Sequence, residues 1–399
     1  MKKCISFIAA VCMSTIPLCE VDAQTVLFKS DSLANCYRIP ALLTASKNKL
    51  FAISDYRYCR SDVGGGKIDI VGRISHDNGE TWKDDVFTLV KGSDDNSNPF
   101  NVAHGDAAVV TDRTTGKMLM MCASGNVYYW NSTLKNPNRV GRYYSGDGVH
   151  WEGEEITDQI YKIMNGAVTK LFFTSGRICQ SSKIKVGKYF RIYSALCTNI
   201  GNVVLYSDDF GKTWLPLGGV EARPTLDGDE AKIIELPNGN VLLSSRSQKG
   251  NGRIFNVYRY SNSKKAIGEW GDAKYLDEKY KAARCNGEIL LVPARRTADG
   301  KKTHVLLFSV PQSDVRHNVG IYYKELATAN DYATPSCFVS EWNTFPVSNL
   351  ASGYSTMELL PDGKVAFFYE ETECKGGYDM VFHKLGLDTI TNGKFVYMK

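Results

Sequence analysis

The sequence has little proline and no long amphipathic helical pattern. Only 12 prolines occur in 399 residues, and no stretch rich in proline, serine or glycine divides the chain. This composition excludes a collagen-like or disordered protein, and we expect one folded domain.

Excess charge of one sign is also missing. The net charge is +5, with no basic run and no stacked aromatic motif. Because nucleic-acid-binding proteins usually carry such features, we expect no nucleic-acid partner.

The six histidines are scattered without H-E-x-x-H spacing, and neither G-x-S-x-G nor a P-loop occurs. We therefore expect no metal and no other cofactor.

The first residues are typical of a targeting segment. Lys2 and Lys3 precede a mostly apolar stretch over residues 5–18, and small residues at 21 and 23 favour cleavage before Gln24. The apolar stretch is too short to span a membrane comfortably. We expect a signal peptide over 1–23 and an exported protein, periplasmic or secreted. A lipid-modified Cys19 is the alternative, disfavoured by the bulky residue before it.

Export would leave eight of the eleven cysteines. An even count permits disulfides in an oxidising compartment, but their wide spacing shows neither a disulfide framework nor a metal-finger pattern. We expect most of them to be buried free thiols.

One short loop pattern recurs along the chain. Residues 75–82 and 207–214 both fit S-x-D-x-G-x-T-W, residues 145–151 are a shorter copy, and a looser relative runs from Ser261 to Trp270. In such a loop the Asp can accept hydrogen bonds from its own turn, and Gly allows positive φ. The Trp is expected to plug the space between neighbouring sheets. The pattern is therefore a device of the fold.

Strand-like runs with turn signals fill the rest of the chain, with hairpin signals at 237–239 (PNG) and 361–363 (PDG). A repeated unit somewhat larger than a four-stranded blade indicates radial repetition. We expect an all-β fold over residues 24–399: a six-bladed β-propeller of four-stranded antiparallel blades. Its first strand region should start at Tyr37.

From about Ser30 to Lys384 the sequence resembles the bacterial exo-α-sialidase (neuraminidase) family, including its Asp-box repeats. The resemblance rests on the order of the motifs: R-I-P near the start, S-D-x-R followed by an acidic loop, the Asp loops, an acidic residue before a strand ending in S-R-S, a lone Arg after a strand, and G-Y-S. It implies a division of labour among particular residues.

Three arginines match the family's carboxylate-binding set: Arg38 in R-I-P, Arg246 in S-R-S, and Arg316 after a strand-like run and a proline. Sialic acid bears a carboxylate on its anomeric carbon, and the planar, permanently charged guanidinium suits that group. Arg295 and Arg296 are neighbouring alternatives to Arg316.

The resemblance assigns the nucleophile to Tyr354 in G-Y-S and its partner to Glu230. A carboxylate nucleophile, which most retaining glycosidases use, would be repelled by the carboxylate of the sugar. A phenol is neutral until it reacts, but its ordinary pKa of about 10 requires a base partner. A core aromatic is the alternative for Tyr354, and Asp227, Asp229 and Glu235 are alternatives to Glu230.

Asp62, in a glycine-containing loop over 60–66, matches the family's acid/base, which protonates the leaving oxygen and then activates water. Asp69 is its alternative, but it lies within a strand-like run and is expected to support structure. Glu370 matches the acidic residue that orients the first arginine, with a solvated strand end as the alternative.

Arg57 and Asp106 match positions that bind the O4 region of the sugar. Trp130 is the candidate for the glycerol or aglycone side. It belongs to the run Tyr128-Tyr129-Trp130, in which we expect some of the rings to face the core, as they would on alternating sides of a strand.

These matches imply a glycoside hydrolase that releases terminal sialic acid from glycoproteins, glycolipids or oligosaccharides in two displacements, through a tyrosyl-sialosyl intermediate. We expect a monomer. Two alternatives stay open: a trans-sialidase or anhydro-forming sialidase on the same site, or a propeller that binds glycans without cleaving them. The joint presence of Tyr354, Glu230 and Asp62 argues against the last.

Overall fold

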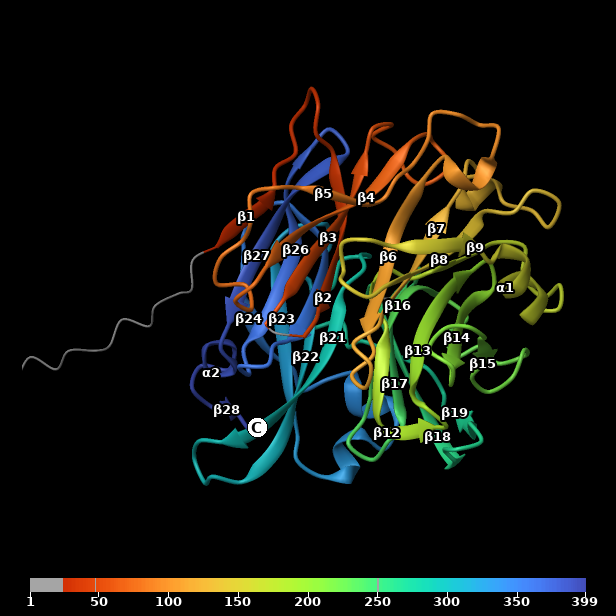
Figure 1. Ribbon diagram of the computed structural model, residues 1–399. Coiled ribbons are helices and arrows are strands. Elements are labelled where there is room, and N and C mark those ends of the chain that lie inside the picture. The colour runs from red at the N-terminus through yellow and green to blue at the C-terminus, as the bar shows by residue number, and fades with distance from the viewer. Residues whose placement is uncertain (1–23, 47, 250) are drawn as a thin grey trace, which may run out of the picture.

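The computed structural model describes residues 24–46, 48–249 and 251–399, so the expected signal peptide lies outside the described residues. Six small sheets, antiparallel apart from one short parallel pairing, form the blades of a β-propeller (Figure 1). The predicted six-bladed all-β architecture is confirmed. Four of the six sheets have a fifth strand, so the prediction of four strands per blade holds for the core of each blade only.

The blades follow one another along the chain. The first has β2 (Tyr37–Thr44), β3 (Leu50–Arg57), β4 (Ile68–Ser75) and β5 (Phe87–Val90). The second has β6 (His104–Thr111), β7 (Met118–Ser124), β8 (Arg139–Ser145) and β9 (Glu152–Glu155), with β11 (Gly176–Arg177) parallel to β6. The third has β10 (Leu171–Phe173), β12 (Cys179–Val186), β13 (Tyr189–Thr198), β14 (Gly201–Ser207) and β15 (Leu215–Pro216).

The fourth blade has β16 (Gly228–Glu235), β17 (Val241–Ser247), β18 (Arg253–Asn262), β19 (Ile267–Trp270) and β20 (Lys274–Tyr275). The fifth has β21 (Glu288–Arg296), β22 (Lys302–Pro311), β23 (Val319–Leu326), β24 (Asn343–Pro346) and β28 (Phe395–Tyr397). The sixth has β25 (Ser352–Leu359), β26 (Val365–Cys374), β27 (Gly377–Leu385) and β1 (Thr25–Phe28). The helices are α1 (Thr157–Ile163), α2 (Leu387–Ile390) and the 3₁₀ turns η1 (Pro99–Asn101), η2 (Tyr129–Asn131), η3 (Ala329–Tyr332) and η4 (Pro335–Phe338).

The N-terminal strand closes the ring. In Figure 1 the red β1 lies beside the blue β27, and Thr25 pairs with Phe382. The expectation that the first strand region starts at Tyr37 is therefore wrong. Leu27 and Phe28 of β1 are buried against the sixth blade, so this strand is held by apolar burial as well as by its ladder.

The recurring loops are stabilised by their own side chains. Ser75 Oγ donates to Asp77 Oδ1 at 2.7 Å, and Asp77 accepts from the backbone N–H of Thr81 at 2.8 Å and from its hydroxyl at 2.6 Å. Burial opposes ionisation of Asp77, but these hydrogen bonds outweigh it and lower its pKa to about 2. The loop at 207–214 has the same contacts.

The tryptophans of these loops differ in burial. Trp214 is 1 % exposed and packs in a core that joins the second and third blades. Trp82 and Trp151 are only partly buried. Of these three tryptophans, only Trp214 is therefore fully enclosed between neighbouring sheets, as predicted.

The cysteines within the described residues are all free thiols, and five of the eight are buried, as expected for most of them. Among the helices of the described residues, none is long and apolar enough to cross a membrane.

Candidate active site

A pocket of about 240 Å³ lies among the starts of the inner strands. Eight of the ten predicted site residues line it: Arg38, Asp62, Asp106, Trp130, Glu230, Arg246, Arg316 and Tyr354. The other two, Arg57 and Glu370, are fully buried behind its wall. Residues from different blades, far apart in the sequence, are therefore brought together.

Irregular pairing at the starts of four inner strands carries the site residues. The register shifts after Arg38 in β2, after Gly105 in β6, after Gly228 in β16 and after Ser352 in β25. Such a bulge re-aims side chains and adds local twist. It places Asp106, Glu230 and Tyr354 at irregular positions. Asp106 itself has φ +55°, a conformation unusual for a residue other than glycine.

Tyr354 and Glu230 form a hydrogen-bonded pair at the base of the pocket. The Tyr354 hydroxyl donates to Glu230 Oε2 at 2.6 Å, and Arg246 Nη1 lies 3.0 Å from the same oxygen. Burial raises the pKa of Glu230, although Arg246 opposes the shift. Burial, and then the Glu230 charge, raise the pKa of Tyr354 well above 10, so the phenol is protonated at neutral pH.

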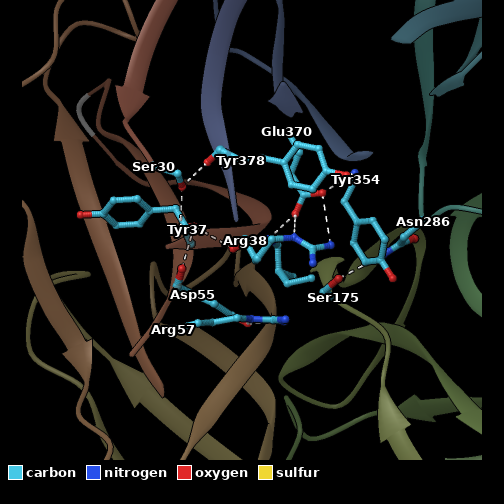
Figure 2. Close-up of polar contacts among 12 residues, drawn as sticks. Ser30, Tyr37, Arg38, Asp55, Arg57, Ser175, Asn286, Tyr354, Glu370 and Tyr378 are labelled. Atoms are coloured by element: carbon cyan, nitrogen blue, oxygen red, sulfur yellow. Dashed lines mark hydrogen bonds and ion pairs between the residues drawn. The ribbon is translucent and has the colours of Figure 1, made fainter. Parts of the chain in front are cut away.

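Glu370 ties Arg38 to the backbone of Tyr354 (Figure 2). Arg38 Nε donates to Glu370 Oε1 at 2.7 Å, while the other carboxylate oxygen accepts the Tyr354 N–H at 2.9 Å. Glu370 is fully buried, which rules out the solvated strand end. Burial opposes its ionisation, but Arg38 and two backbone N–H groups lower its pKa overall.

Arg316 differs from the other arginines of the site. Its guanidinium lies 5.2 Å from the centre of the Tyr354 ring. Within the described ranges, no hydrogen bond or ion pair involves its side chain, so its donors face the pocket free. Arg295 and Arg296 do not line the pocket, and Arg296 is paired with Asp299 and Glu325 on the outside.

Asp62 lies at the mouth of the pocket. Its side chain is 72 % exposed, and Asp62 Oδ1 accepts from Arg57 Nη1 at 2.5 Å. Burial raises its pKa, but Arg57, with Arg38 and Arg316, lowers it overall. The alternative, Asp69, lies in β4 and accepts from Tyr58 and from the N–H of Gly92, away from the pocket.

The aromatic run 128–130 was predicted to include core residues, and this is wrong. Tyr128, Tyr129 and Trp130 all line the pocket, and none of them is buried. Tyr129 and Trp130 lie in the 3₁₀ turn η2, which Tyr128 directly precedes, and none of the three is in a strand, so the side chains do not alternate between two faces. Trp130 is 68 % exposed at the rim.

The chain is similar in sequence and in fold to known sialidases. No family model matches the chain. A sialidase of Paraclostridium sordellii is 26 % identical over 88 % of the chain and 86 % of its own length. Sialidases of Bacteroides fragilis and Micromonospora viridifaciens are 22 % and 26 % identical, and the chain spans 61 % and 50 % of their lengths.

The chain is a relative of the bacterial sialidases. Solved structures support the same fold: a Hadza microbial sialidase has a TM-score of 0.69 at 23 % identity, covering 89 % of this chain and 66 % of its own. A leech intramolecular trans-sialidase has a TM-score of 0.73 at 16 % identity, covering 94 % and 71 %.

Several pocket residues of this sialidase relative were not among the predicted site residues. Asp229 has a carboxylate oxygen 3.6 Å from Arg246 Nε, whereas the sequence offers it only as an alternative to Glu230. Val127, Asn138 and Phe172 also line the pocket. They lie outside the recurring motifs, and no local pattern in the sequence points to them.

Proposed function

We propose that the protein is an exo-α-sialidase that hydrolyses terminal sialic acids from glycoconjugates with retention of configuration, through a tyrosyl-sialosyl intermediate. The observation that carries the proposal is the 2.6 Å contact between the Tyr354 hydroxyl and Glu230 in a pocket lined by three arginines. The named sialidases among the relatives support the reaction class.

The arginines would bind the carboxylate of the sugar. Arg38 is held in place by Glu370, and Arg246 by Glu230, while Arg316 keeps its donors free. A charged, planar donor set of this kind suits a carboxylate. Since the carboxylate is on the anomeric carbon, it would bring that carbon next to the Tyr354 ring, which two of the guanidinium groups flank at 5.5 and 5.2 Å.

In the first step, Tyr354 Oη attacks the anomeric carbon as its proton passes to Glu230. Asp62 protonates the glycosidic oxygen, and the bond to the aglycone breaks. In the second step, Asp62 accepts a proton from water, whose oxygen attacks the same carbon. The tyrosyl bond breaks and Glu230 returns the proton to Tyr354. Two inversions at one carbon give net retention.

Substrate binding would also prepare Asp62 as an acid. In the free protein its pKa is lowered by Arg57 and further by Arg38 and Arg316. A bound carboxylate neutralises the last two, so the pKa of Asp62 rises when the substrate is in place. The proton required by the leaving oxygen is then available in the complex.

NMR analysis of products from 3′- and 6′-sialyllactose tests the proposal. We expect free sialic acid, released first as the α-anomer. An anhydro sugar, or sialic acid moved to another glycan, would point to the intramolecular or transfer reaction. An intact substrate that nevertheless binds would point to a glycan-binding propeller.

We also propose that the protein is exported, based on the basic and apolar N-terminal segment, and that it is a monomer. N-terminal sequencing of the protein from the producing cell should begin at Gln24. Light scattering should give the mass of one chain.

A further inference from the structure

Asp55 is a buried carboxylate that does not line the pocket, yet it contacts two residues of the site. It lies in β3 and is 1 % exposed. Its Oδ2 accepts from Arg57 Nε at 3.2 Å and from Arg57 Nη2 at 3.0 Å, and its Oδ1 accepts from the backbone N–H of Asp106 at 3.1 Å. Both oxygens are thus used by neighbours of the pocket.

The contact to Asp106 crosses from the first blade to the second. Asp106 has the strained φ described above, and the hydrogen bond that its N–H donates to Asp55 stabilises that backbone. The preceding residue, Gly105, leaves no room for a side chain, because an added Cβ would lie 2.7 Å from Asp55 Oδ2. The position of the Asp55 carboxylate is therefore defined on two sides.

The contact to Arg57 continues to Asp62. Arg57 uses Nε and Nη2 on Asp55 and Nη1 on Asp62. Across the residues that the structure describes, Arg57 is the only hydrogen-bond partner of the Asp62 carboxylate, which is otherwise largely exposed. Without a fixed guanidinium, nothing in this part of the chain would hold the Asp62 side chain in one orientation.

We infer that Asp55 is a positioning residue that, through Arg57, holds the Asp62 carboxylate over the pocket and at the same time fixes Asp106. This inference rests on the proposed function, in which Asp62 is the acid. Asp55 itself touches no substrate.

The test compares two substrates that share the sialyl group and differ in the leaving group. Lactose leaves as an alkoxide that requires protonation, whereas an umbelliferyl sialoside releases a phenolate that requires little. Lost contacts to the sugar affect both substrates equally, so the ratio of their kcat/KM values reports on the acid.

Asp55→Asn keeps the size of the side chain but replaces one acceptor oxygen with an NH2 group, which meets a donor on either side, the Arg57 guanidinium or the Asp106 N–H. We expect kcat/KM on 3′-sialyllactose to fall at least about tenfold more than on the umbelliferyl sialoside, since positioned acids contribute about 10²–10⁴-fold. Gly105→Ala should change the ratio in the same direction by displacing the carboxylate without removing it.

Asp69→Asn is the matched control. Asp69 is a buried carboxylate of the same blade, 3 % exposed, and it also accepts a backbone N–H, from Gly92. Its replacement should leave the substrate ratio at the wild-type value even if stability falls.

Ratios within twofold of wild type in both Asp55→Asn and Gly105→Ala would overturn the inference. If Asp55→Asn does not fold, Gly105→Ala alone decides. A wild-type protein that cleaves neither substrate refutes the proposed function and the inference together. An active wild type with unchanged ratios in the variants refutes the inference only.

Discussion

Arg316 and Arg38 are expected to bind the same carboxylate, yet their removal should differ in its effect on stability. Arg38 is paired with Glu370, which is fully buried. The Arg316 side chain has no hydrogen bond or ion pair within the described part of the chain, and its guanidinium lies over the face of the Tyr354 ring. Replacing each by alanine separates substrate binding from folding.

The expected magnitudes follow from these contacts. Arg38→Ala leaves a buried carboxylate without its cation, which costs about 3–5 kcal/mol. Arg316→Ala loses a contact with one ring, worth about 1 kcal/mol. Both variants lose hydrogen bonds to a charged group, each worth about 1.5–3 kcal/mol, so kcat/KM should fall at least about tenfold in both.

Urea unfolding at pH 7 and turnover of an umbelliferyl sialoside measure the two effects. We expect similar losses of kcat/KM, with Arg38→Ala at least about 2 kcal/mol less stable than Arg316→Ala. Equal destabilisation would show that Arg316 is held by a bond as strong as that of Arg38. Unchanged turnover in Arg316→Ala would show that it does not bind the substrate.

Two further predictions concern Glu370 and the loop tryptophans. The pKa of Glu370 is below its ordinary value of 4.5 in the folded state, so its ionisation stabilises the fold above about pH 4.5. This contribution is lost as the pH falls through the lowered pKa. In urea unfolding, Glu370→Gln should therefore be clearly less stable than wild type at pH 7, and the difference in free energy of unfolding between the two should become smaller below about pH 4.5. A difference that is constant with pH would contradict the assignment. Trp214→Ala should cost about 3–5 kcal/mol, because Trp214 is 1 % exposed, and half-buried Trp82→Ala clearly less; equal losses in thermal or urea unfolding would refute the difference in packing.

The sequence allowed prediction of features that are set locally. Turn residues and strand runs indicate the blades, because hairpins form between neighbours in the chain. Strand β1 was missed because its partner, β27, lies at the other end of the chain. A four-residue strand has no strong local signal, and this one forms only because it pairs with β27 when the ring of blades closes.

The site shows the same limit. Tyr354, Glu230 and the arginines lie in recognisable motifs, whereas Asp55 gains its importance from Arg57 and from a residue of the next blade, Asp106. Asp55 lies two residues before Arg57 on the same strand, and residues two apart on a strand share a face. This spacing is the signal in the sequence that could have identified Asp55. The expectation for 128–130 is wrong because it rests on strand alternation, whereas the chain makes a 3₁₀ turn there.

The central claim is that a phenol attacks the sugar. A 2,3-difluorinated sialic acid tests it, because fluoride leaves from the anomeric carbon while the second fluorine slows hydrolysis of the covalent product. Mass spectrometry of the treated protein should show one added sugar, peptide mapping should place it on Tyr354, and Tyr354→Phe should take up none. A label on another residue would contradict the account. So would a wild-type protein that hydrolyses sialosides but takes up no label from the difluorinated sugar.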